Sequence, residues 1–169
     1  MALIPSTPAD GNIRTVIVTT VVDPYNPTAA ELNAGVDISC YLTPGGFALT
    51  TDQGTITDER ECSTQTFGAP GRKTYGLTIT GIDNTNSTNA TEYNELVEAL
   101  PEGAQRYAYR RRGLPYETAF AAAQETTVVP FVAGVKGEVA SEANSVLRSV
   151  WTSFITGDVE SVTVAAGGA

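Results

Sequence analysis

Histidine is missing from the 169-residue sequence, and cysteine occurs only twice. Without histidine, the Ser-His and Cys-His nucleophile systems and most zinc sites are excluded. The two cysteines, Cys40 and Cys62, are too few for a disulfide scaffold. We expect both thiols to be buried, while a pairing between neighbouring strands stays open. A phosphate-binding glycine loop is also absent, because Gly45-Gly46 is not followed by Lys-Ser/Thr.

Basic residues are scarce: the chain has 10 Lys and Arg against 19 Asp and Glu, which gives a net charge of −9. Phosphate affinity comes from Lys and Arg, so this balance argues against tight binding of DNA or RNA. The middle of the chain, residues 63–116, holds six basic and five acidic side chains and is less negative than either end. This middle either attracts the acidic ends of other copies head to tail or is an ordinary solvated surface.

Long apolar runs are absent as well. No stretch approaches the ~18 apolar residues of a membrane-spanning helix, so we expect no membrane insertion. The N-terminal Met-Ala-Leu-Ile-Pro lacks the basic region of a signal peptide. We therefore expect the protein to be made in the cytoplasm of the producing cell.

The sequence does contain a series of short, alternating β-type runs. The central stretch, residues 46–82, holds three of them, at 47–51, 63–67 and 73–82. The charged block Asp58-Glu59-Arg60-Glu61 and the breaker Gly68-Ala69-Pro70-Gly71 separate these runs. Further strands are predicted at 13–22, 36–42, 105–112, 126–135, 146–155 and 159–164. Within 126–135, Pro130 indicates an edge strand or a bulge.

Helical signals are fewer. Residues 91–100, TEYNELVEAL, repeat apolar side chains at i, i+3, i+4 and i+7 from Tyr93, with a cap-like pair at Asn89 and Glu92. A weaker signal is the capping-box spacing of Thr28 and Glu31. About eight strands and one well-defined helix predict a mainly-β fold. We expect a single domain, 1–169, with an N-terminal arm at about 1–12 and a C-terminal tail at about 165–169.

Two charged clusters are candidates for a functional role: Asp58, Glu59, Arg60 and Glu61, and Arg110, Arg111 and Arg112. Paired carboxylates can serve as acid and base in a glycosidase-like cleft, but a charged turn is far commoner. The arginines contact phosphate, contact an acidic partner such as another copy, or are solvated at a strand end. The net charge favours the acidic partner over phosphate. We predict no catalytic, cofactor-binding or metal-binding residue, and inter-subunit contacts at both clusters.

Four blocks of sequence carry a family resemblance: AELNAGVDISCYLT at 30–43, TTDQGTITDERECSTQTFGAPGRKTYGLTI at 50–79, RRRGLP at 110–115 and SEANSVLRS at 141–149. Together they resemble the major tail tube proteins of long-tailed, siphovirus-type bacteriophages, especially those of actinobacteria. The resemblance implies a β-sandwich or partial barrel with one flanking helix. It also implies assembly into hexameric rings that stack in the virion tail, where the sheets of successive copies join into a continuous β-barrel around a lumen.

The same resemblance implies the partners. These are other copies of the chain, the tape-measure, terminator and distal tail proteins, and a genome that passes through the lumen into the host without tight binding. Since a basic lumen would retain DNA, we expect carboxylates to outnumber Lys and Arg on the lumen face. We also expect Arg110–Arg112 to pair with acidic groups of an adjacent copy. The alternatives are another virion β-protein, such as a capsid decoration or head–tail joining protein, and a soluble hydrolase.

Overall fold

One antiparallel sheet of nine strands dominates the chain in its computed structural model, which describes residues 3–166. The strands are β1 (Ile13–Val18), β2 (Val36–Asp37), β3 (Leu42–Asp58), β4 (Phe67–Ile82), β5 (Gln105–Arg112), β6 (Glu125–Val132), β7 (Lys136–Glu138), β8 (Arg148–Ile155) and β9 (Glu160–Thr163). Their order is β2-β1-β5-β6-β8-β4-β3, with β7 beside β8 and β9 beside β6. Two short helices, α1 (Ala29–Asn33) and α2 (Glu95–Ala99), complete the fold, so the predicted mainly-β class is confirmed.

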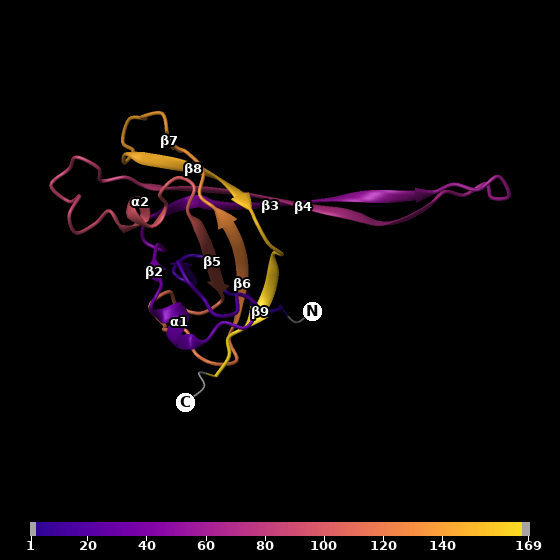
Figure 1. Ribbon diagram of the computed structural model, residues 1–169, viewed down its shortest axis with the longest axis horizontal. Helices are drawn as coiled ribbons and strands as arrows, with labels where there is room; N and C mark the ends of the chain where they lie inside the picture. Colours follow the sequence, from indigo (N-terminus) through magenta and orange to yellow (C-terminus); the bar gives the residue numbers. More distant parts are fainter. Residues whose placement is uncertain (1–2, 167–169) are drawn as a thin grey trace.

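The sheet curls over on itself where β8 changes its neighbour. Residues Arg148–Ser153 of β8 pair with β4, whereas Phe154 and Ile155 pair with β6. The strands β7, β8, β4 and β3 therefore form one layer, and β1, β5 and β6 form the layer that faces it (Figure 1). The main core fills the space between the layers and includes Ile17, Leu77, Ile79, Leu96, Ala108, Phe131 and Trp151. This curled open sheet is the partial-barrel form of the expected architecture.

A second apolar cluster covers the opposite face of β1, β5 and β6. It includes Val16, Leu32, Tyr109, Val128 and Val162, and α1 supplies its Leu32. Neighbouring residues of one strand, such as Ala108 and Tyr109, therefore belong to different clusters. The apolar residues at the centre of the first predicted strand, Val16, Ile17 and Val18, are covered on both faces in this way, as expected. The strand ends at Val18 and not at the predicted Val22, which is exposed. The capping box of α1 is also confirmed, since the Thr28 and Glu31 side chains each accept from the other's backbone N–H.

Pro130 lies inside β6 without being at an edge of the sheet. On one side, β6 pairs with β9 over Glu125–Val128 and with β8 from Phe131 onward. Pro130 falls in the interval between these two partners, and its carbonyl accepts from the N–H of Thr156. A residue without an N–H is tolerated in this interval because neither neighbouring ladder needs a donor there.

The central stretch forms one long hairpin instead of three short strands. Residues 63–67, predicted as a strand, form the turn region and the start of β4, while the predicted breaker 68–71 lies within β4 and pairs with β3. A register shift between Gln53 and Thr55 accommodates these residues as an irregularity of the ladder. Glycine and proline are tolerated here because both strands are free on their outer sides.

The predicted helix at 91–100 is reduced to the five residues of α2. The Asn94 side chain makes no cap hydrogen bond to α2, and its Oδ1 instead accepts from the Asn84 N–H at 3.1 Å. Asparagine side chains thus hold the preceding residues as a loop, which competes with helix formation. Leu96 is buried as expected, but Tyr93, on the predicted apolar face, is 57% exposed.

The prediction that both thiols are buried is wrong. Cys40 lies in a turn after β2, which is only two residues long, and Cys62 lies at the end of the β3–β4 hairpin. Both are exposed and unpaired within the described chain. Residues 3–10 form no helix or strand, and positions 1–2 of the predicted arm and 167–169 of the predicted tail lie outside the described residues.

Arg111 is an integral part of the fold, with 1% of its surface exposed. Its guanidinium donates to the carbonyls of Ala119 and Pro115 at 3.2 and 2.9 Å and to Gln124 Oε1 at 3.1 Å. The same group stacks 5.1 Å from the centre of the Phe120 ring. Burial lowers the pKa of Arg111, with the Arg14 charge as a second cause. This arginine fixes the loop between β5 and β6.

We predict that Arg111→Met destabilises the protein by about 2–4 kcal/mol, because three buried oxygens lose their charged donor. Urea unfolding followed by circular dichroism measures the change. The neighbouring Arg112 is exposed, so Arg112→Met provides the matched control and should shift stability by less than about 0.5 kcal/mol. Equal effects of the two substitutions would contradict the structural role of Arg111.

Asp83 ties the loop after β4 to the β7–β8 pair. Its Oδ2 accepts from Lys136 Nζ at 2.8 Å and from Ser149 Oγ at 2.6 Å, and its Oδ1 accepts from the Thr85 N–H at 2.9 Å. Burial alone would raise the pKa of Asp83, but the hydrogen bonds from Lys136, Ser149 and Thr85 outweigh it and hold the pKa well below its usual value. The ionised carboxylate therefore stabilises the fold.

For Asp83→Asn, we predict a loss of stability of about 1–3 kcal/mol at pH 7. Because the folded-state pKa lies below the unfolded value of about 3.9, the carboxylate contributes fully above that pH and loses its contribution as the pH falls toward the folded pKa. The difference between wild type and variant should therefore shrink below about pH 4. Denaturation curves from pH 2.5 to 7 test this, and a difference that does not change with pH would refute it.

Candidate functional site

A bare β-ribbon projects from the body of the protein, and we call residues 51–74 the hairpin arm. Figure 1 shows β3 and β4 continuing far beyond the other strands. The body ends near Leu77, the last β4 residue paired with β8, so within residues 3–166 the two strands of the arm pair only with each other. Eight residues in each strand give a projection of roughly 25 Å. Nearly all residues of the arm are exposed.

The arm carries apolar side chains that no other part of the described chain covers. Ile56 is 59% exposed and Phe67 is 54% exposed. An isolated two-stranded ribbon is marginally stable in water, and exposed β-branched and aromatic residues make it a template for association. These properties indicate that a partner covers the arm.

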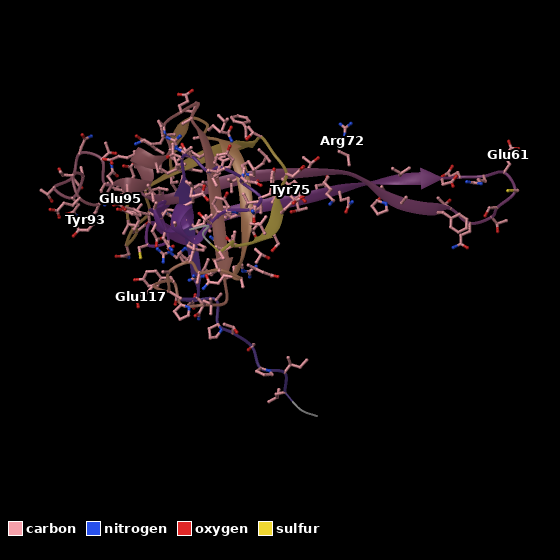
Figure 2. All side chains as sticks on the ribbon, turned by 60° about the horizontal axis from the view of Figure 1, so that its bottom comes forward. Glu61, Arg72, Tyr75, Tyr93, Glu95 and Glu117 are labelled. Atoms are coloured by element: carbon pink, nitrogen blue, oxygen red, sulfur yellow. The ribbon has the colours of Figure 1, made fainter. Side chains whose placement is uncertain are left out.

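The tip of the arm, residues 59–66, holds Glu59, Arg60 and Glu61 of the predicted charged cluster, and Asp58 is the last residue of β3 beside it. Arg60 Nη2 contacts Asp58 Oδ2 at 2.9 Å, so the charge of Asp58 is balanced by the tip's arginine. Glu59 and Glu61 are exposed and form no ion pair within the described residues, and Figure 2 shows Glu61 at the far end of the molecule. The tip therefore presents a surplus of negative charge beside Cys62.

An open groove of about 390 Å³ lies at the opposite end of β3. It is lined by Ala9, Asp10, Gly11, Ile13, Thr15, Ser39, Cys40, Leu42, Thr43, Pro44, Gly45, Gly46, Phe47, Arg110 and Tyr116. Arg110 Nη1 donates to Thr15 Oγ1 at 2.9 Å, and its guanidinium lies 4.8 Å from the centre of the Phe47 ring. Burial lowers the pKa of Arg110, and the charge of Arg112 adds to this effect.

The three predicted arginines therefore occupy three different environments. Arg110 is half-buried in the groove and takes part in no ion pair among residues 3–166. Arg111 points to the opposite side of β5, where its own chain encloses it, so it has no exposed guanidinium with which to contact another copy. Arg112 is exposed at the strand end. Strand alternation was the signal in the sequence that could have separated Arg111 from its neighbours.

The acidic tip and the arginines do not meet within one chain. The tip stands at the end of the arm, whereas Arg110 lies beside the opposite end of β3. Any contact between the two charged clusters requires a second copy. The tip and the groove therefore each carry charged side chains that form no ion pair among residues 3–166.

The layer β7-β8-β4-β3 also has two unpaired strand edges. Its outer strands are β7 and β3, and neither has a second neighbour among residues 3–166. The Val139 N–H donates to the Arg148 carbonyl at 3.1 Å, so by alternation the N–H of Glu138 points away from β8. The layer therefore offers unlike hydrogen-bonding edges on its two sides: a long edge on β3 and a short edge on β7.

Two further observations concern the described part of the chain. No three His, Cys, Asp or Glu side chains within residues 3–166 come together as a group able to hold a metal ion. Across the same residues, neither helix has the length and apolar character needed to cross a membrane.

Comparisons with known proteins identify relatives of this chain by fold and by sequence family. Among curated proteins, no sequence matches the chain. Among solved structures, the chain is similar to a protein in the six-fold symmetrised cryo-EM structure of the anti-feeding prophage (AFP) baseplate, with a TM-score of 0.55 and 10% identity. That likeness covers 95% of this chain and 99% of the other, and it concerns the fold. The family model described as phage tail tube protein matches residues 1–168. The chain, with its projecting hairpin arm and open sheet edges, belongs to the phage tail tube protein family.

Proposed function

We propose that this protein is the self-assembling subunit of a siphovirus-type phage tail tube, in which hexameric rings stack and the bore conducts the genome into the host. The family membership makes it a structural protein of the virion tail. The observation that carries the finer proposal is the layer β7-β8-β4-β3, which has one covered face and two free, unlike edges.

The two free edges of the layer, a long one on β3 and a short one on β7, are compatible with assembly into a closed ring. If β3 of one copy pairs with β7 of the next, each contact is heterologous, and the series ends only when the ring closes. Six copies of four strands give a barrel of about 24 strands, more than the 16–18 strands that leave an aqueous channel in porins. The main core already covers one face of the layer.

The covered face decides which side of the layer faces the bore. The body of each copy lies against the face that carries Leu77, Ile79 and Trp151, and this bulk fits only outside a closed barrel. The uncovered face would then line the bore. By strand alternation, its centre consists of Thr78 and Thr80 from β4 and Thr152 from β8.

The uncovered face also explains how DNA passes without tight binding. Its centre carries no Lys or Arg, and its charged residues, Asp52, Asp58, Arg72 and Arg148, lie toward its ends. Phosphate affinity requires many basic contacts at once. We propose that the low charge of this face, more than the excess of carboxylates expected from the sequence, lets the genome slide.

The hairpin arm would connect successive rings. Barrel strands tilt about 35–45° from the barrel axis, so strands that continue beyond the body leave the plane of their own ring. The arm then reaches the neighbouring ring, whose subunits cover its exposed Ile56 and Phe67. Tape-measure, terminator and distal tail proteins would meet the ends of the stack, and assembly would follow synthesis in the host cytoplasm.

We expect purified protein to form hollow tubes or stacked rings in negative-stain electron microscopy. In a shortened variant, residues 54–72 are replaced by Asn-Gly, a two-residue turn that joins the paired Gln53 and Lys73. This variant should give single rings without tubes, because ring closure remains while the connection between rings is lost. Monomers or small closed oligomers of the wild type would instead support a capsid decoration or head–tail joining protein.

Ring closure has its own test at the edge of β7. Of the backbone donors of β7, Glu138→Pro removes only the N–H that points away from β8. The fold should therefore be retained while rings fail to close. Glu138→Thr removes the same side chain, keeps the N–H and should form rings. Analytical ultracentrifugation distinguishes monomers from rings, and rings formed by the proline variant would exclude β7 from the interface.

A further inference from the structure

The tip of the arm and the groove lie at opposite ends of one strand. The groove is lined by the beginning of β3, from Leu42 to Phe47, and the tip follows its end at Asp58. A strand of 17 residues spans roughly 55 Å. A copy displaced along β3 by about that length therefore brings its groove beside the tip of the first copy. Such a contact uses different surfaces on the two copies, so it does not close and extends without limit.

The groove contains a cation that lacks a counter-ion. Arg110 is half-buried, its guanidinium bonds to the neutral Thr15 hydroxyl, and no carboxylate pairs with it among residues 3–166. Asp10 also lines the groove, but it is exposed and takes part in no ion pair within the same residues. A partly desolvated guanidinium binds a carboxylate through two parallel hydrogen bonds, so the groove is suited to an acidic ligand.

The tip supplies a ligand of that chemistry. Glu59 and Glu61 are exposed and unpaired within the described chain, whereas Asp58 is neutralised by Arg60. The tip is an eight-residue loop, and the groove of about 390 Å³ is open along one side. The tip carboxylates are therefore opposite in charge to Arg110, and a second copy of this chain supplies both surfaces of such a contact.

We propose that the tip of one copy docks in the groove of a copy in the next ring, where the carboxylate of Glu59 or Glu61 accepts hydrogen bonds from Arg110. The contact rests on the proposed stacking function and assigns its residues. It also brings the only two cysteines of the chain together, because Cys62 follows Glu61 in the tip and Cys40 lines the groove.

The charge contact is tested by neutralising the tip. In Glu59→Gln/Glu61→Gln, rings should still form, but the yield of tubes at a fixed protein concentration should fall at least tenfold, since charge-assisted bonds are lost at every stacking contact. The control Glu125→Gln/Glu160→Gln removes two exposed carboxylates from β6 and β9, away from the tip and the groove, and should form tubes as the wild type does. Wild-type tube yield in the tip variant would overturn the proposal.

The position of the tip is tested by crosslinking preformed tubes with a short bismaleimide, which alkylates one thiol at each end. If Cys62 meets Cys40 of another copy, denaturing electrophoresis should show a ladder of dimers, trimers and longer species. Cys40→Ser and Cys62→Ser tubes should each give monomers only. Dimers in a single-cysteine variant, or no crosslinks in wild-type tubes, would overturn the docking. Failure to form tubes at all would instead refute the proposed function, so the two failures are distinguishable.

Discussion

Unpaired backbone along the edge of a sheet is the constraint on which this structure depends. β3 runs for 17 residues with β4 as its only neighbouring strand in the described part of the chain, so the backbone groups on its other side have no partner strand there. Folded monomers usually prevent such edges from pairing with other chains by means of short edge strands, charged side chains or covering loops. Here the edge is long, and its outer half stands clear of the body. A partner strand satisfies these groups more fully than the chain itself can.

The rest of the fold keeps these edges available while making the body stable. Trp151 and Ile79 anchor the inner strands β8 and β4 in the main core, which leaves β3 and β7 on the outside. Asp83 holds β7 against β8 through Lys136 and Ser149. Arg111 fixes the loop beside the groove without exposing its charge. The residues that stabilise the body are therefore different from those of the proposed assembly contacts, which allows each set to be altered separately.

Strand alternation predicted the parts of the fold that are locally determined. β5 matches its predicted range because QRYAYRRR alternates between two apolar clusters and ends at Gly113, whose φ of +95° favours glycine. The capping box at Thr28 is equally local. The hairpin arm was not predicted because Pro70 and Gly71 normally interrupt a strand, and only the absence of outer neighbours makes them acceptable there. β7 is too short to give a periodic signal.

The sequence by itself determined the fold class, the shortage of basic charge and the family, because composition, alternation and extended blocks of similarity are properties of the chain taken in order. Only the tertiary structure decided that Arg110 lies in a groove, that Arg111 is enclosed and that the acidic tip stands at the far end of β3. Burial and free edges depend on which strands become neighbours. That pairing joins residues far apart in the sequence, such as Val16 with Tyr109 and Ile79 with Trp151, and no local pattern contains it.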